Sequence, residues 1–262
     1  AVNKFFHTVL SSWVLGAVFV IGISCWFLLK KRDKEFAVAS IKIGAVFGLV
    51  ASLLTVWTGD GSGYAIAQTQ PMKLAAVEGY YEGQNGAGLV AVGLLNPEKK
   101  TYDDGQDPFL FRIEIPKMLS LLAERKVDAF VPGIKNIIEG GYELKDGTKA
   151  LSAAEKIEKG KKAIAALATY RTAKKEGDEA AAKEAYTTLQ ENVPYFGYGY
   201  IKDVNQLVPN VPLNFYAFRV MVILGGYFIL FFILVLFFAY KKDLSKIRWM
   251  QYVALWTIPL AY

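Results

Sequence analysis

Three long stretches that almost lack charge constrain this chain more than any other feature. Residues 5–29 contain no Lys, Arg, Asp or Glu, residues 36–57 contain only Lys42, and residues 213–240 contain only Arg219. A helix needs about 20 apolar residues to cross a hydrocarbon core of about 30 Å. Each stretch is therefore predicted to be a membrane-spanning helix.

A fourth apolar stretch, residues 250–262, runs to the end of the sequence. It is too short to cross a bilayer, and we expect it to be the start of a fourth membrane helix. The first stretch is too long for the apolar part of a signal peptide and lacks a small-residue cleavage site. The sequence begins at Ala1, almost directly in that stretch, so both ends are expected to be breaks in a longer protein.

The charges are distributed unevenly. Residues 59–212 hold 19 Lys/Arg and 21 Asp/Glu, whereas the remainder holds 11 Lys/Arg and only 3 Asp/Glu. The excess of positive charge lies beside the apolar stretches, which indicates membrane topology and not nucleic-acid binding. One cysteine and one histidine among 262 residues exclude a disulfide scaffold and a multi-histidine metal site.

Two basic clusters fix the predicted orientation. They follow the first and third apolar stretches and comprise Lys30, Lys31, Arg32 and Lys34, and Lys241, Lys242, Lys246 and Arg248. Short loops rich in Lys and Arg remain in the cytoplasm. Residues 59–212 are then extracytoplasmic, and the predicted organisation is two membrane helices in 1–58, an outer segment in 59–212, and a third helix with the start of a fourth in 213–262.

The outer segment is too long for a plain connection and is predicted to fold, mainly as helix. Residues 109–115 alternate weakly and indicate a short strand, after which Pro116 can open a helix to about Arg125. Residues 149–176 show helical spacing of apolar residues. Gly177 and Asp178 then form a break and an N-cap for a second helix to about Asn192, so a helical hairpin is expected. The fold class is an all-α integral membrane protein with a large, mainly helical extracytoplasmic loop.

Two motifs in the outer segment resemble ligand-binding loops but are not interpreted as binding sites. The glycine-rich residues 59–63 follow a membrane helix and not a strand, which argues against a dinucleotide-binding loop. Asp103, Asp104 and Asp107 lack the complete pattern of a calcium loop and are interpreted as a turn.

His7, Met221 and Arg219 are the candidates for cofactor binding. His7 is either an interfacial histidine bonded to a neighbour or an axial haem ligand. Met221 lies about 12 Å inward from Leu213, a depth broadly similar to that of His7. Met221 either packs in the apolar helix or is the second axial ligand, and Arg219 either pairs with another helix or meets a haem propionate.

Residues 70–82 (QPMKLAAVEGYYE) are the candidate for substrate chemistry. They follow the second membrane helix closely and hold Lys73, Glu78 and Glu82 beside Tyr80 and Tyr81. A quinol needs a hydrogen-bonding partner for its oxygen and an acceptor for its proton when it is oxidised. Lys73 and Glu78 can supply both, although a solvated helix explains the same residues. Five residues correspond to about 140° net around a helix, so the two do not share one face of a regular helix.

Five stretches resemble subunit I of the bacterial cytochrome bd-type quinol oxidases. They are KFFHTVLSSWVLGAVFVIGIS at 4–24, GDGSGYAIAQTQPMKLAAVEGYYE at 59–82, IPKMLSLLA at 115–123, FYAFRVMV at 215–222 and, more weakly, WTIPLAY at 256–262. They occur in order over the whole chain, and the second stretch is the most specific.

The resemblance implies specific roles. His7 and Met221 match the ligands of the family's low-spin haem b, and Arg219 matches the arginine beside that methionine. Lys73 and Glu78 match the lysine and glutamate of the quinol-binding loop, and the length of 59–212 is similar to that of the longer-loop subclass. The implied enzyme sits in the bacterial inner membrane. It oxidises quinol at the outer face, reduces O₂ to water and generates proton-motive force.

The family's second haem b, its haem d, much of its oxygen-reducing site and its subunit II are implied for the complete enzyme. The family's other haem ligand and its Gly-Arg-Gln-Pro motif are absent from this sequence. The alternative is a non-enzymatic membrane receptor or transport component, which fits the topology but does not predict the order of the motifs.

Overall fold

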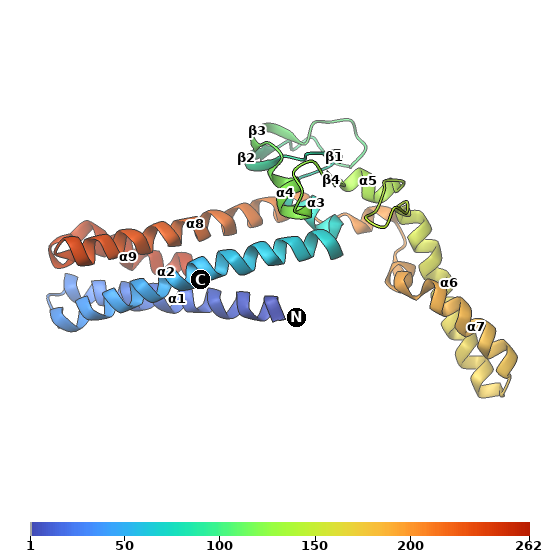
Figure 1. Cartoon of the computed structure of the whole chain (residues 1–262), viewed down its shortest axis with the longest axis horizontal. Coiled ribbons are helices and arrows are strands. Elements are labelled where there is room, and N and C mark those ends of the chain that lie inside the picture. Colours follow the sequence, from blue (N-terminus) through green and yellow to red (C-terminus); the bar gives the residue numbers. More distant parts are fainter. Residues whose placement is uncertain (1) are drawn as a thin grey trace. The chain divides into compact units, whose positions relative to one another are not determined.

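The computed structural model describes residues 2–262, which divide into two compact units (Figure 1). The first unit contains residues up to 65 and from 217 to the end, and the second contains residues 66–216. The units are described separately.

The first unit is a bundle of long helices. They are α1 (Val2–Leu29), the part of α2 (Lys34–Thr69) up to residue 65, and the part of α8 (Val211–Lys241) from residue 217. All three are long and apolar enough to cross a membrane, which confirms the three predicted spans. Two short segments, η3 (Leu244–Lys246) and α9 (Arg248–Thr257), lead to η4 (Ile258–Ala261).

The second helix is longer than the sequence predicted. The sequence predicted that this helix ends at Trp57, but α2 continues through the glycine-rich residues 59–63 to Thr69. Asn3 of α1 donates hydrogen bonds to the Thr58 carbonyl at 3.0 Å and the Ser62 hydroxyl at 2.8 Å, and so holds this extension. The glycine-rich stretch is therefore helical.

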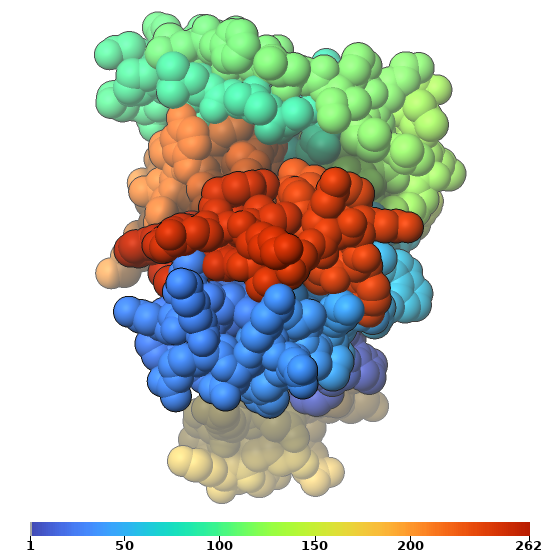
Figure 2. Space-filling model, turned by 90° about the vertical axis from the view of Figure 1, so that its left-hand side faces the viewer, coloured from blue at the N-terminus to red at the C-terminus, as the bar shows by residue number. Residues whose placement is uncertain are grey.

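The two basic clusters lie together at one end of the first unit. Lys34 pairs with Asp243 at 3.4 Å, and Lys31, Arg32 and Ser245 line one small hollow. Figure 2 faces this end and shows the blue α1–α2 connection beside the red α8–α9 connection. Both clusters therefore belong on the same side of a membrane, as their shared composition predicted.

The second unit combines short helices with two small antiparallel sheets. Strand β1 (Gln84–Asn85) pairs with β4 (Phe130–Val131), and β2 (Leu89–Leu95) pairs with β3 (Phe109–Ile115). The predicted strand 109–115 is confirmed, whereas β2 was not predicted. The helix expected to open at Pro116 begins two residues later, as α4 (Met118–Glu124), because Lys117 adopts a left-handed conformation. The unit also contains α3 (Pro71–Glu78) and α5 (Ile134–Glu139).

The predicted helical hairpin is present as α6 (Ala153–Glu176) and α7 (Glu179–Asn192), followed by the 3₁₀ segments η1 (Val193–Tyr200) and η2 (Val204–Leu207). Helix α6 starts later than expected because Ser152 and Glu155 form a capping box. Gly177 ends α6 in a left-handed conformation, and the Asp178 carboxylate accepts from the Ala181 amide at 3.0 Å, as predicted.

One close helix contact in the first unit depends on a glycine. A Cβ added at Gly48 of α2 would collide with the ring of Phe232 in α8 and would lie 2.9 Å from Ala17 in α1. Phe232 is fully buried, so its ring cannot move aside without disturbing the core. Small residues allow membrane helices to approach closely in this way.

We predict that Gly48→Ala destabilises the bundle by about 1–3 kcal/mol, because the new methyl group overpacks the core. The measurement is the thermal unfolding midpoint of the solubilised full-length protein. The matched control is Gly16→Ala in α1, where nothing lies within 4 Å of the added Cβ. Equal midpoints for the two variants would contradict the role given to Gly48.

Candidate functional site

His7 in α1 is held by α2. Its Nδ1 lies 3.0 Å from the Thr58 hydroxyl oxygen. The same hydroxyl lies 3.0 Å from the Leu54 carbonyl and 3.1 Å from that of Thr55, to which it donates. The Thr58 oxygen then accepts a hydrogen bond from Nδ1–H of His7, which leaves the Nε2 lone pair available to a metal. This contact was not predicted, since nothing in the sequence pairs residues so far apart.

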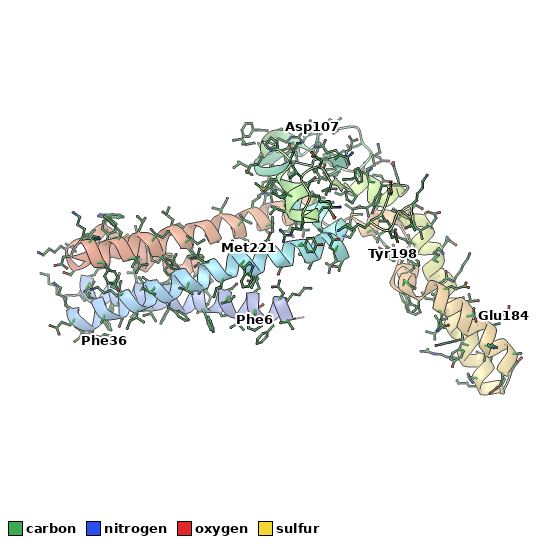
Figure 3. The ribbon with its side chains drawn as sticks, viewed as in Figure 1. Phe6, Phe36, Asp107, Glu184, Tyr198 and Met221 are labelled. Atoms are coloured by element: carbon green, nitrogen blue, oxygen red, sulfur yellow. The ribbon has the colours of Figure 1, made fainter. Side chains whose placement is uncertain are left out.

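Met221 lies in the least packed part of α8. Its side chain is 54% exposed, as is that of Val222, whereas Phe231 and Phe232 further along the helix are almost fully buried. Phe6, the neighbour of His7, and Met221 lie at a similar level along the bundle (Figure 3). The donor set of one imidazole and one thioether fits a haem iron, and the unpacked stretch of α8 can accommodate a large apolar group.

Arg219 lies two residues before Met221 and is half-buried. Its guanidinium carbon is 5.5 Å from the centre of the Phe218 ring. An arginine in an apolar helix is costly in free energy unless it is paired.

Lys73 and Glu78 are carried by the same short helix, α3, but are not brought to one face. Lys73 is exposed, whereas Glu78 is only 3% exposed. Helix α3 begins with Pro71 and ends at Gly79, whose left-handed conformation (φ 62°) closes the helix directly after Glu78. The separation expected from the spacing of five residues is thus observed.

The residues after Glu78 are tightly enclosed. A Cβ at Gly79 would lie 2.9 Å from the ring of Phe109 and 3.3 Å from Phe215, so β3 and the start of α8 pack against this turn. The Tyr80 hydroxyl is buried, and burial raises its pKa to about 12. The end of α3 is therefore packed against aromatic rings at Gly79, next to a buried glutamate and a buried tyrosine hydroxyl.

The connection between β2 and β3 is a polar turn that covers Tyr81. Lys99 is almost fully buried there and pairs with Asp104 at 2.6 Å, while its ammonium nitrogen lies 4.7 Å from the centre of the Tyr81 ring. The hydrogen bond from Lys99, with those from nearby backbone amides, holds the pKa of Asp104 well below its usual range. The turn predicted for the aspartates is confirmed, but the part played by Lys99 was not foreseen. Asp104 lies in the same turn, but Tyr81 is distant from Lys99 in the sequence, and no short motif connects the two.

The described residues thus define an integral membrane protein with three apolar spans, a histidine and a methionine near one end of the bundle, and a separate folded segment that buries a carboxylate. The whole chain, residues 1–262, matches the family described as cytochrome bd terminal oxidase subunit I. The chain belongs to this family, which confirms the resemblance and removes the support for a non-enzymatic receptor or transport component.

Individual relatives agree with this membership. The chain is 32% identical over 277 residues to cytochrome bd-II ubiquinol oxidase subunit 1 of Escherichia coli, a match that covers 99% of this chain and 49% of the relative. It is 31% identical over 132 residues to a putative cytochrome bd menaquinol oxidase subunit I of Bacillus subtilis, covering 49% of this chain and 28% of that one. The chain therefore spans about half the length of the relative that it matches throughout.

A solved structure supports the fold. The bd oxidase from Geobacillus thermodenitrificans superposes with a TM-score of 0.61 at 19% identity, over 99% of this chain and 43% of that one. At this identity the similarity concerns the fold alone.

Proposed function

We propose that this chain is the quinol-oxidising part of subunit I of a cytochrome bd-type quinol oxidase. Quinol is oxidised at the outer face of a bacterial inner membrane, and its electrons pass through low-spin haem b towards the reduction of O₂. The complete enzyme would add a second haem b, haem d and subunit II, and would generate proton-motive force. Membership of the family supports the reaction.

The observation that carries the proposal is the burial of Glu78 at the end of α3. A carboxylate kept from bulk water is suited to accept a proton from a substrate that is itself largely apolar. Lys73 is proposed to donate a hydrogen bond to a quinol oxygen. The two hydroxyls of a para-quinol lie at opposite ends of its ring, so partners on different sides of α3 can serve one head group.

His7 and Met221 are proposed to hold the low-spin haem b, and Arg219 its propionate. The haem, when bound, supplies a one-electron acceptor near the outer face. Thr58 supports this assignment because its hydroxyl donates to the Leu54 and Thr55 carbonyls and so accepts a hydrogen bond from Nδ1–H of His7, which leaves Nε2 for the iron. The level shared by Phe6 and Met221 is consistent with His7 and Met221 holding one group (Figure 3).

The ligand assignment predicts that Met221→Leu removes the low-spin haem b signal or converts it to high spin, because leucine keeps the volume but lacks the thioether. The visible reduced-minus-oxidised spectrum of membranes containing the full-length protein is the measurement. Val222→Leu is the matched control, since Val222 is equally exposed. A normal low-spin signal in Met221→Leu would exclude Met221 as a ligand.

The quinol assignment predicts that Glu78→Gln lowers turnover with quinol by about a hundredfold, the lower end of the range for a lost proton acceptor. Lys73→Ala should raise KM for quinol about tenfold, as expected for one charge-assisted hydrogen bond. Both variants should retain the haem spectrum and consume oxygen with an artificial donor that bypasses the quinol site. Glu82→Gln is the matched control, because the Glu82 side chain is 82% exposed. Normal quinol turnover in Glu78→Gln and Lys73→Ala would refute the assignment.

The topology predicts that trypsin added to intact spheroplasts cuts the α6–α7 hairpin, where the exposed Lys174 and Lys175 precede the Gly177 turn. The basic residues Lys241 and Lys242 should be cut only after lysis. Protection of the hairpin in intact cells, with cleavage at Lys241, would invert the orientation.

A further inference from the structure

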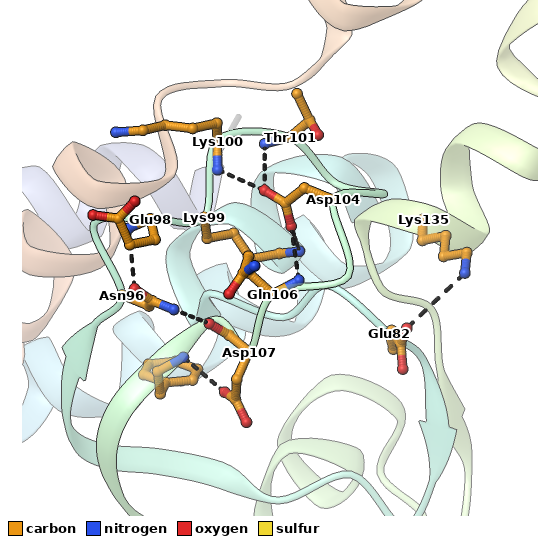
Figure 4. Close-up of polar contacts among 11 residues, drawn as sticks. Glu82, Asn96, Glu98, Lys99, Lys100, Thr101, Asp104, Gln106, Asp107 and Lys135 are labelled. Carbon is orange, nitrogen blue, oxygen red and sulfur yellow. Dashed lines mark hydrogen bonds and ion pairs between the residues drawn. The ribbon is translucent and has the colours of Figure 1, made fainter.

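The turn between β2 and β3 is built around one carboxylate. Asp104 accepts hydrogen bonds from the amides of Lys100 at 2.6 Å, Thr101 at 2.9 Å and Gln106 at 3.0 Å, in addition to its ion pair with Lys99 (Figure 4). The Asn96 side chain closes the base of the turn by donating to the Asp107 carbonyl at 2.9 Å. These hydrogen bonds fix the conformation of the turn. The turn can therefore hold the Lys99 side chain in a defined position.

Lys99 connects this turn to Tyr81. Its side chain is 6% exposed, and its ammonium lies between the Asp104 carboxylate and the face of the Tyr81 ring. A lysine at a surface turn normally extends into water, because burying an ammonium group costs free energy. Here the charge is compensated on one side by a carboxylate and on the other by an aromatic face.

The backbone around Tyr81 is held from a second direction. The amides of Ile134 and Lys135 donate to the carbonyls of Tyr80 and Tyr81, each at 3.0 Å, and the Gly83 amide donates to the Asn136 side chain at 2.6 Å. The start of α5 thus fixes the main chain after Glu78, whereas Lys99 is positioned to fix the ring of Tyr81.

We propose that Lys99 and Asp104 are positioning residues for quinol oxidation. Through the ring of Tyr81 they hold the segment that directly follows Glu78, and so keep the shape of the place where the quinol head group would bind beside Glu78. This inference rests on the proposed function of Glu78, and it assigns Lys99 and Asp104 no contact with the quinol. Since the pair acts on placement and not on proton transfer, its loss should affect KM for quinol more than kcat.

The test uses the full-length oxidase with subunit II in membranes, and a water-soluble ubiquinol analogue as the donor. Lys99→Met should raise KM about tenfold, as expected when a buried cation–π contact and an ion pair are lost, with kcat changed by less than about twofold. Lys99→Arg keeps the charge and should restore a normal KM. Lys100→Met is the matched control, because the Lys100 side chain is exposed and only its amide meets Asp104.

Two variants of the partner residue complete the test. Tyr81→Phe keeps the ring and should behave as the wild type, whereas Tyr81→Leu should reproduce the rise in KM. The double variant Lys99→Met/Tyr81→Leu should add nothing further, because both changes remove the same contact.

A normal KM in both Lys99→Met and Tyr81→Leu would overturn the proposal. Loss of haem, or an equal fall in kcat, in Lys99→Met and Tyr81→Leu would also overturn it, since the contact would then serve general stability. Failure here is distinguishable from failure of the proposed function. Glu78→Gln tests the proton acceptor directly, and its loss of turnover stands whether or not Lys99→Met changes KM.

Discussion

The arrangement of the candidate quinol site depends on the left-handed turn at Gly79. Without a Cβ, Gly79 can adopt φ 62° and lie against the Phe109 ring, and α3 therefore ends directly after Glu78. The turn keeps Glu78 buried and directs the next two residues towards α5 and Lys99. Any other residue at position 79 would be strained, and its side chain would collide with Phe109. The burial of Glu78 and the contact between Lys99 and Tyr81 therefore both depend on the turn at Gly79.

In the first unit, a small residue and a hydroxyl-bearing residue likewise determine how neighbouring groups are placed. Gly48 allows the Phe232 ring to pack against the backbone of α2, and Thr58 places a hydrogen-bond acceptor beside His7. Close helix packing fixes the backbone, and the Thr58 contact then orients one imidazole ring. We infer that His7 is prepared for a metal by its neighbours, which is the usual arrangement for a histidine ligand.

The parts of the fold that sequence reasoning predicted are those set by local patterns. Long apolar runs gave the three spans, and Gly177 with Asp178 gave the helical hairpin. Strand β2 was missed because its burial does not alternate regularly: the pairing with β3 shifts between Val90 and Val92 and again between Leu94 and Leu95. The end of α2 was misplaced because residues 59–63 have the composition of a loop, whereas contacts from Asn3 support their helical form.

The site residues also divide into features that local patterns predict and features that depend on distant contacts. The spacing of Lys73 and Glu78 correctly predicted that they lie on different faces of a helix, but it could not show which one is buried. Burial depends on packing between distant parts of the sequence, as the contacts of Phe109 and Phe215 with the adjacent Gly79 illustrate. The role of Lys99 depends on a ring and a carboxylate in different segments. His7 and Met221 were selected by residue type and depth, and their ligation of haem stays a prediction.

Photoaffinity labelling of the full-length oxidase with an azido-quinone analogue tests the central claim most directly. If quinol is oxidised at the end of α3, peptide mapping should find the label within residues 70–83 or the turn at 96–108, and excess ubiquinol should suppress it. Labelling that ubiquinol suppresses equally well but that lies wholly outside residues 66–216 would contradict the account.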